Sequence, residues 1–234
     1  MSKMLPLEVA PDAAALAKAA VRHVIAAVDA ALDERGRFTV AFSGGGTPRR
    51  FFAELTHRPL PWRSIHVFQV DERVAPPGHR DRNLTALATQ LLGRVPIPAA
   101  NVHPMPVEAA DLEAPAVSYA AEIREVCGPE GVLDLVHLGL GDDGHTASWP
   151  PGDPVVDVTD ADVAVVGPYR GYRRMTLTPP AVNRAGFILW LVDGADKAPA
   201  LARLLEGDPT IPAARVRRDG AVVLASADAA PPAP

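Results

Sequence analysis

A stretch near the middle of the chain, LGLGDDGHTAS, contains the residues best suited to acid–base chemistry. His145 follows a strongly apolar run at 133–140, and Asp142 and Asp143 stand just before it. An imidazole can take a proton from water near neutral pH, and a neighbouring carboxylate can orient the ring and stabilise its charged form. A lone histidine is more often structural, so it is the position of His145 and its neighbour Asp143 that favour a catalytic role. A metal site is a weaker interpretation, because the other histidines lack ligand spacing and the single cysteine lies elsewhere.

A second stretch, SGGGTP, has the composition of an anion-binding turn. Consecutive glycines between a strand and a helix let backbone N–H groups approach an anion, and the helix N-terminus adds a favourable dipole. The alternative is a tight turn that binds no ligand. The spacing matches neither the Walker pattern nor G-x-G-x-x-G, so nucleotide binding is disfavoured. The candidate phosphate-binding residues are Gly44, Gly45, Gly46 and Thr47, with Ser43 as a further hydroxyl.

Charged residues in three other segments are further candidates for a binding site. Asp71 and Arg73 emerge at the end of an apolar run, where an open α/β sheet forms its crevice. Arg174 and Lys197 offer a planar fork and a compact charge, respectively, for a phosphate. Only three of the 23 basic residues are lysines, so Lys197 stands out. The competing interpretations are a solvated loop with internal salt bridges for the first segment and a charged helix end for Lys197.

The elements that must position these side chains alternate between strand and helix. Continuous apolar runs predict buried strands, and apolar residues at helical spacing predict amphipathic helices between them. This order favours an α/β fold with a doubly wound, mainly parallel sheet and helices on both faces, in which ligands bind at the carboxyl ends of the strands. The predicted strands are 38–42, 65–70, 133–140 and 187–192, with a short strand at 173–178 turning into a helix, and the predicted helices are 12–35, 48–55, 82–92, 111–126 and 196–206.

Length and composition limit the class of protein further. The chain of 234 residues fits one domain, with a Pro-rich end at 228–234 that we expect to be frayed. A net charge of −5 without a basic cluster disfavours a nucleic-acid partner, and no apolar run is long enough for a membrane span. The single cysteine, Cys127, and the lack of an export signal suit the cytoplasm. We expect a monomer or a small homo-oligomer.

Taken together and in order, AFSGGGTP, DER with Asn83 behind it, LGLGDDGHTAS, RMTLT and GADKA resemble the 6-phosphogluconolactonase family over nearly the whole chain. The resemblance implies a fold shared with glucosamine-6-phosphate deaminase and ribose-5-phosphate isomerase. It implies hydrolysis of 6-phospho-D-glucono-1,5-lactone in the oxidative pentose phosphate pathway, with a sugar phosphate as the small-molecule partner and no metal or organic cofactor. His145 would be the acid/base residue. Arg174, Lys197 and the glycine turn would surround the phosphate, and Arg73 would face either the phosphate or the lactone oxygens.

Two departures from the family pattern and two rival functions remain. Trp149 stands where the family commonly has leucine and is expected at the rim of the pocket, and Arg82 replaces a common serine. A deaminase would resemble DGHIAFNEP and would carry a glutamate five residues beyond the histidine, where this chain has Pro150. Asp71 would still be available as a base for that chemistry. The second rival is a sugar-phosphate sensor without catalysis, although a single long helix before Phe38 leaves no room for a helix-turn-helix reader.

Overall fold

A seven-stranded parallel sheet forms the centre of the computed structural model, which describes residues 4–231. Every neighbouring pair of its strands runs parallel. In spatial order the strands are β1 (Leu7–Ala10), β10 (Ala221–Ser226), β9 (Phe187–Val192), β6 (Leu135–Gly139), β2 (Phe38–Phe42), β3 (Ile65–Gln69) and β5 (Val102–His103). The predicted parallel sheet is therefore confirmed, and its four predicted strands occupy the centre.

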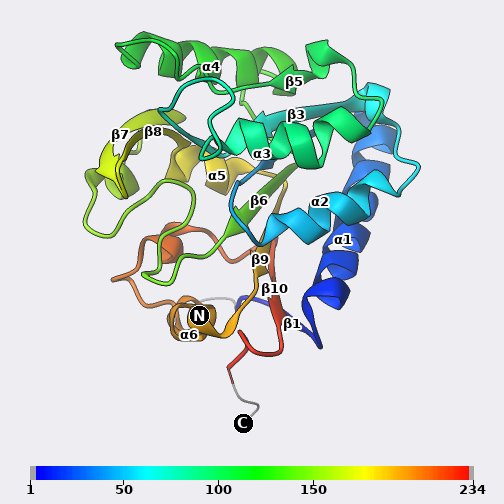
Figure 1. The fold of residues 1–234 in the computed structure, drawn as a ribbon, viewed down its shortest axis with the longest axis vertical. Coiled ribbons are helices and arrows are strands. Elements are labelled where there is room, and N and C mark those ends of the chain that lie inside the picture. Colours follow the sequence, from blue (N-terminus) through cyan, green and yellow to red (C-terminus); the bar gives the residue numbers. More distant parts are fainter. Residues whose placement is uncertain (1–3, 232–234) are drawn as a thin grey trace.

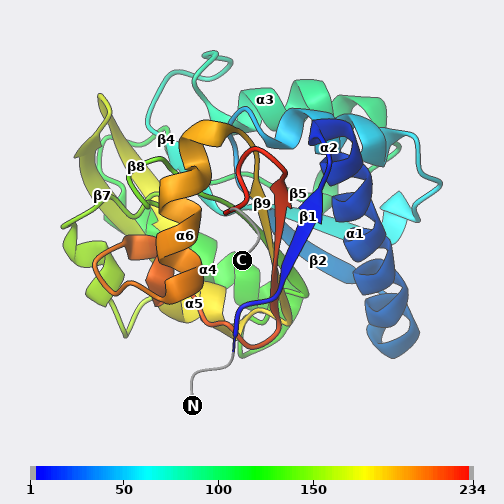
Figure 2. The same cartoon turned by 90° about the horizontal axis from the view of Figure 1, so that it is seen from below.

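Helices cover both faces of this sheet and create two separate apolar cores (Figure 1). One core contains residues of α1 (Ala13–Arg35), α2 (Pro48–Thr56) and α3 (Asn83–Gln90). The other contains residues of α4 (Glu113–Cys127), α5 (Pro179–Arg184) and α6 (Ala198–Glu206). Figure 2 shows α1 and α6 on opposite sides of the strands. Burial on both faces explains why the central strands are continuous apolar runs without alternation.

The helix boundaries follow the capping signals in the sequence. The Asp12 side chain accepts a hydrogen bond of 2.7 Å from the Ala15 backbone N–H at the start of α1, and Gly36 ends that helix in a left-handed conformation with φ of 69°. Pro48 opens α2 at a position where its missing N–H costs nothing. The remaining short helices are of the 3-10 type: η1 (Trp62–Ser64), η2 (Leu92–Arg94), η3 (Ala99–Asn101), η4 (Pro154–Asp157), η5 (Ala195–Lys197) and η6 (Pro212–Arg215).

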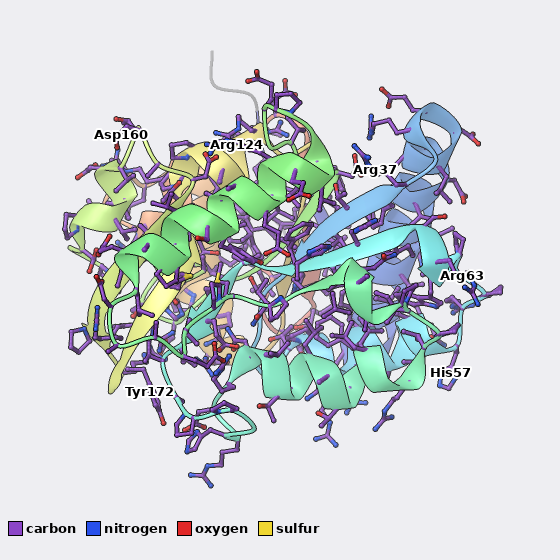
Figure 3. All side chains as sticks on the ribbon, turned by 90° about the horizontal axis from the view of Figure 1, so that it is seen from above. Arg37, His57, Arg63, Arg124, Asp160 and Tyr172 are labelled. Carbon is purple, nitrogen blue, oxygen red and sulfur yellow. The ribbon has the colours of Figure 1, made fainter. Side chains whose placement is uncertain are left out.

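A second, antiparallel sheet of three strands lies beside the first. The sequence predicted only its middle strand, at 173–178, and not the sheet. Its order is β4 (Asp71–Arg73), β8 (Tyr172–Leu177) and β7 (Val163–Tyr169). The chain changes sheets at Val70, whose N–H still donates to Phe42 of the parallel sheet while its carbonyl accepts from Leu177. Asp71 and Arg73 therefore belong to a strand and not to a polar loop. In Figure 3, α4 lies across this side of the molecule, and Tyr172 lies near the loop that follows β4.

Both ends of the described chain are joined to the fold through strands that were also not predicted. β1 pairs with β10, and β10 pairs with β9. After β10, Ala229 is fully buried, and its N–H donates to the carbonyl of Ser226 at 3.0 Å. The expected fraying from residue 228 is thus wrong at Ala229, while 232–234 lie outside the described residues. Within residues 4–231 no helix has both the length and the apolar character needed to cross a membrane.

Candidate active site

One polar cavity of about 270 Å³ opens at the carboxyl ends of the central strands. The turns after β2 and β6, strands β4 and β8, and η5 all contribute to its wall. Nine of the predicted site residues line it: Gly44, Gly45, Gly46, Thr47, Asp71, Arg73, His145, Arg174 and Lys197. The tenth, Asp143, contacts His145 from behind. His145 and Lys197, which are far apart in sequence, therefore share one cavity.

His145 and Asp143 form a close pair on the turn that follows β6. The distance from His145 Nδ1 to Asp143 Oδ1 is 2.6 Å, and the His145 backbone N–H donates to the same oxygen at 3.1 Å. Because an ionised carboxylate only accepts, the imidazole proton lies on Nδ1 and the Nε2 lone pair is free. Gly141 is required here, since a Cβ at this position would lie 1.9 Å from His145 Nδ1. The predicted contact between Asp143 and His145 is therefore present, and the orienting role of Asp143 stays a prediction.

Tyr169, at the end of β7, contacts both members of this pair, and the sequence did not predict it. Its hydroxyl donates to Asp143 Oδ2 at 2.5 Å and lies 3.1 Å from His145 Nδ1. Burial alone would raise the pKa of Asp143, but the hydrogen bonds from Tyr169 and His145 outweigh it and hold that pKa well below its ordinary value. Burial and the adjacent Asp143 carboxylate raise the pKa of Tyr169 to about 12. The carboxylate therefore stays charged and the phenol stays protonated near neutral pH.

Asp71 lies in a different environment, in the buried wall made by β4 and β8. Its Oδ2 accepts a hydrogen bond of 2.6 Å from the Ser148 hydroxyl, and Arg174 Nη1 is 4.0 Å away. Burial is the largest effect and raises the pKa of Asp71, against the opposing influence of Ser148, Arg73 and Arg174. Arg174 is itself 4% exposed and is held by the Tyr169 carbonyl and the Ser148 hydroxyl. Its guanidinium carbon lies 4.9 Å from the centre of the Tyr169 ring.

The residue between Asp71 and Arg73 has a structural function. Glu72 is fully buried, and its carboxylate accepts from the backbone N–H groups of Asn83 and Leu84 at the start of α3, both at 2.8 Å. It also accepts from the Arg73 N–H at 2.7 Å and the Gln69 side chain at 2.9 Å. A carboxylate at a helix N-terminus complements the helix dipole. Glu72 therefore joins β4 to α3 and fixes the backbone from which Arg73 extends.

The glycine turn approaches its neighbours too closely for any side chain at Gly44. A Cβ there would lie 2.0 Å from Asn83 Oδ1. Among the described residues no hydrogen bond engages the backbone N–H groups of 44–47, which precede the N-terminus of α2. These free donors can bind an anion. The Ser43 hydroxyl is not available in the same way, because it donates to the His137 carbonyl at 2.9 Å.

His137 lies beneath this turn as a buried neutral side chain. Its Nδ1 accepts from the Ser43 backbone N–H at 3.3 Å, and three phenylalanine rings surround it: Phe42, Phe51 and Phe52. Burial lowers the pKa of His137 to about 3. It lines the cavity, but because it stays neutral we assign it to support of the turn. Sequence reasoning did not single it out, since it stands within an apolar strand.

Cationic side chains form a further part of the cavity wall. Lys197, in η5, is paired with its neighbour Asp196 at 2.9 Å and remains half-buried in the cavity wall. Arg170, at the tip of the β7–β8 hairpin, lies 2.8 Å from Asp142 and 3.5 Å from Asp143. With Arg73 and Arg174 these residues give the cavity four cations. Asp71 is the only acidic residue lining this cavity within the described chain, so the cavity suits an anionic ligand.

The two departures from the family pattern lie outside the cavity wall. Trp149 is fully buried in the core, where its indole N–H donates to the Leu177 carbonyl at 2.7 Å. The expectation that it lies at the rim is therefore wrong. Arg82 is 2% exposed and faces Glu72 at 3.2 Å and Glu108 at 2.9 Å. It connects the loop after β4 to the segment before α4 and does not reach the cavity.

The described residues contain no group of three or more histidine, cysteine or acidic side chains arranged to hold a metal ion. Cys127 is half-buried at the end of α4, and burial raises the pKa of its thiol to about 11. It therefore remains a protonated, unreactive thiol near neutral pH.

Fold and cavity together define an α/β protein with a cation-lined cavity at the carboxyl edge of a parallel sheet and a histidine–carboxylate pair at that cavity. The family model for glucosamine-6-phosphate isomerases/6-phosphogluconolactonase matches residues 11–224, and the chain belongs to this family.

Individual relatives agree with this membership. A 6-phosphogluconolactonase from Synechocystis is 43% identical over 185 residues, which cover 76% of this chain and 77% of the relative. The crystal structure of a 6-phosphogluconolactonase from Thermotoga maritima has a TM-score of 0.84 at 29% identity and covers 94% of this chain and 98% of that one. A monomeric glucosamine-6-phosphate deaminase has a TM-score of 0.83 at 20% identity, covering 96% and 98% of the two chains, which shows a common fold.

Proposed function

We propose that this protein hydrolyses 6-phospho-D-glucono-1,5-lactone to 6-phospho-D-gluconate. The observation that carries the proposal is that His145, paired with Asp143, shares one cavity with four cationic side chains and the free N–H groups of the glycine turn. A phosphorylated lactone needs a base for water at one end and an anion site at the other. The names of the Synechocystis and Thermotoga relatives support the same substrate.

His145 serves as the base in the first step. With its proton on Nδ1, the ring uses Nε2 to take a proton from a water molecule as the water oxygen bonds to the lactone carbonyl carbon. The resulting imidazolium lies beside the Asp143 carboxylate, which stabilises its charge. The tetrahedral intermediate then breaks the bond between the carbonyl carbon and the ring oxygen. The ring oxygen takes the proton back from His145 and becomes a hydroxyl group.

Arg73 is our candidate for stabilising the oxyanion that develops in this step. It extends into the cavity from β4, and its Nη1 donates to the Asp81 carbonyl at 2.9 Å, which fixes the guanidinium. Preorganised donors of this kind contribute about 3 kcal/mol each to transition-state stabilisation. Asp71, whose pKa burial raises, stands in the adjacent wall and can donate a hydrogen bond to a lactone hydroxyl in its protonated form.

The phosphate is held at the other end of the cavity. The N–H groups of Gly44, Gly45, Gly46 and Thr47 supply neutral donors, and Lys197 and Arg174 supply charge. Fixing this remote group aligns the lactone carbonyl with His145. Because the phosphate takes no part in bond breaking and several groups hold it, we expect the loss of one of its contacts to raise KM more than it lowers kcat.

Deamination of glucosamine 6-phosphate is less well supported. Pro150 is buried at the position five residues beyond His145, and among residues 4–231 Asp71 is the only carboxylate that lines the cavity. The shared fold with a deaminase does not decide the reaction, because one fold can host several activities. A sensor without catalysis would not require the His145–Asp143 pair.

The decisive experiment is a coupled assay with freshly generated lactone, corrected for its spontaneous opening. We expect turnover that depends on enzyme concentration, and no ammonia from glucosamine 6-phosphate. Binding of 6-phosphogluconate without turnover would favour the sensor, and robust ammonia release would favour the deaminase. A denatured sample of the same protein is the control for the correction.

We also propose that the chain acts as one domain in the cytoplasm, as a monomer or small homo-oligomer without a metal or organic cofactor. Its single cysteine suits a reducing compartment, and the two cores share one central sheet. Light scattering coupled to size exclusion would give the oligomeric state. Activity that survives exhaustive treatment with a chelator would support the absence of a metal, and loss of activity restored by one metal ion would contradict it.

A further inference from the structure

Tyr169 makes more contacts with the reacting groups than its place on a surface hairpin would suggest. Its hydroxyl lies 2.5 Å from Asp143 Oδ2 and 3.1 Å from His145 Nδ1. Its ring meets the His145 ring edge-on at 5.4 Å and contacts Arg174 on a face. The tyrosine is half-buried, and the cavity is lined by its neighbours and not by Tyr169 itself. It therefore acts on the site through other residues.

The number of protons available on Tyr169, His145 and Asp143 determines the direction of each hydrogen bond. A phenol has one proton, and at 2.5 Å this proton is donated to Asp143 Oδ2, the better acceptor because it is charged. The other oxygen, Oδ1, receives the Nδ1–H and the backbone N–H of His145. Each oxygen of Asp143 thus has a defined partner, and the carboxylate cannot rotate without losing a charge-assisted hydrogen bond.

The turn of the β7–β8 hairpin places Tyr169 beside Asp143 and His145. Arg170 has a φ of 49°, which is uncommon for a residue with a side chain, and Gly171 follows with a φ of 87°. These two left-handed residues make a tight turn that pairs Tyr169 with Tyr172. Backbone strain of this kind persists where the surrounding structure holds it, and it is frequent at functional sites.

We propose that Tyr169 is a positioning residue for the reaction, whose hydroxyl holds Asp143 so that His145 keeps its proton on Nδ1 and presents Nε2 to water. This inference rests on the proposed lactonase function. The hydroxyl has a second effect: by sharing the negative charge of Asp143, it limits how strongly the carboxylate attracts the imidazolium. His145 can then return its proton to the ring oxygen in the second step.

Other charged groups also act on this pair and must stay constant in any test. Arg170 lies 3.5 Å from Asp143 Oδ2, and Arg174 is stacked on the Tyr169 ring. The remaining charged or titratable side chains that line the cavity or adjoin this loop are Asp142, Asp71, Arg73, His137 and Lys197. The variant Tyr169→Phe removes only the hydroxyl and keeps the ring beneath Arg174.

The test compares Tyr169→Phe with Tyr172→Phe, which loses the same hydroxyl from the same hairpin. The Tyr172 hydroxyl donates to Asp81 at 2.7 Å and does not contact His145 or Asp143. For Tyr169→Phe we expect kcat to fall about tenfold with little change in KM, as expected for loss of a hydrogen bond to a charged group. We expect the pH profile of kcat/KM to change in Tyr169→Phe and to match the wild type in Tyr172→Phe.

Two further measurements separate positioning from a loss of structure. Nitrogen NMR of labelled histidine should show a mixture of His145 tautomers in Tyr169→Phe and a single one in Tyr172→Phe. In a double-mutant cycle, Tyr169→Phe should have little effect once Asp143→Ala is present.

If the wild type is active and the pH profile of Tyr169→Phe superimposes on that of the wild type, the positioning role is overturned and the proposed function stays intact. Additive effects in the cycle would do the same. A wild type without lactone turnover would instead overturn the proposed function. Tyr169→Leu, which also removes the platform for Arg174, should add a rise in KM to the fall in kcat.

Discussion

The surroundings of two aspartates at the candidate site shift their pKa values in opposite directions. Asp143, on the half-open turn after β6, receives hydrogen bonds from Tyr169 and His145, which hold its pKa well below the ordinary value. Asp71, in the wall between β4 and β8, is fully buried, and its burial raises its pKa. Environments that separate the pKa values of neighbouring carboxyl groups are a general way to assign different roles to them. Asp143 is thus suited to stabilise a neighbouring cation, whereas Asp71 is protonated more readily than an exposed aspartate.

The largest effect that this comparison predicts is at the histidine that Asp143 serves. His145→Ala should lower kcat about a thousandfold, because general base catalysis is lost while the phosphate contacts remain. The coupled lactone assay measures this loss, and circular dichroism checks the fold. His57→Ala, which removes an exposed histidine labelled in Figure 3, is the matched control. Near-normal turnover of His145→Ala would remove this residue from the mechanism.

A smaller effect separates the two aspartates directly. Asp143→Asn should lower kcat about a hundredfold, because an amide cannot stabilise the imidazolium and favours the wrong tautomer. Asp71→Asn should lower it less than about tenfold, because an amide resembles a protonated carboxyl group and keeps a hydrogen-bond donor. Steady-state kinetics of both variants near pH 7 give the ratio. If both substitutions lower kcat by the same factor, the different environments of Asp143 and Asp71 do not give the two residues different catalytic roles.

Asp142→Asn provides the control for charge alone. Asp142 is exposed, adjoins Asp143 in sequence and pairs with Arg170 at 2.8 Å. Exposed ion pairs contribute little, so this variant should stay within about twofold of the wild type. A large loss here would show that the net charge of the turn matters more than the hydrogen bonds to Asp143.

The smallest effect is expected at the phosphate end, where no bond changes. Lys197→Ala should raise KM for the phosphorylated lactone about tenfold and leave kcat within a few-fold, since it removes one charge-assisted contact. Lys18→Ala, which removes an exposed lysine from α1, is the matched control. A fall in kcat without a change in KM would place Lys197 beside the lactone and not beside the phosphate.

The parallel sheet was predictable because its central strands are buried on both faces and therefore read as continuous apolar runs. The second sheet was not. β4 has three polar or charged residues, and β7 contains Gly167 and Pro168, which usually interrupt strands. These segments form strands because of tertiary pairing with β8. The edge strand β1, with two exposed residues out of four, gave no clear apolar pattern either.

In the candidate site, too, some residues were predictable from the sequence and others depended on tertiary contacts. The convergence of His145, Arg73 and Lys197 followed from a general rule about the carboxyl ends of parallel strands. Tyr169 and Ser148 could not be found in this way, because their partners are brought to them only by the folded hairpin and the β4–β8 pairing. Trp149 shows the converse error. It follows the candidate catalytic turn and was expected at the rim of the cavity, but it lies in the core.

The change of sheets at Val70 has a consequence for the order in which the protein becomes active during its synthesis. β4 leaves the ribosome soon after β3, yet its partner β8 is made only when most of the chain has emerged. Until then Asp71 and Arg73 have no strand to pair with, and the wall that carries Arg174 does not exist. A nascent chain that ends before β8 also lacks β9 and β10, which contribute residues to the core under α1 and α2, so it has neither the complete core nor the wall of the pocket. Catalytic competence is thus acquired late, through a contact between segments distant in sequence.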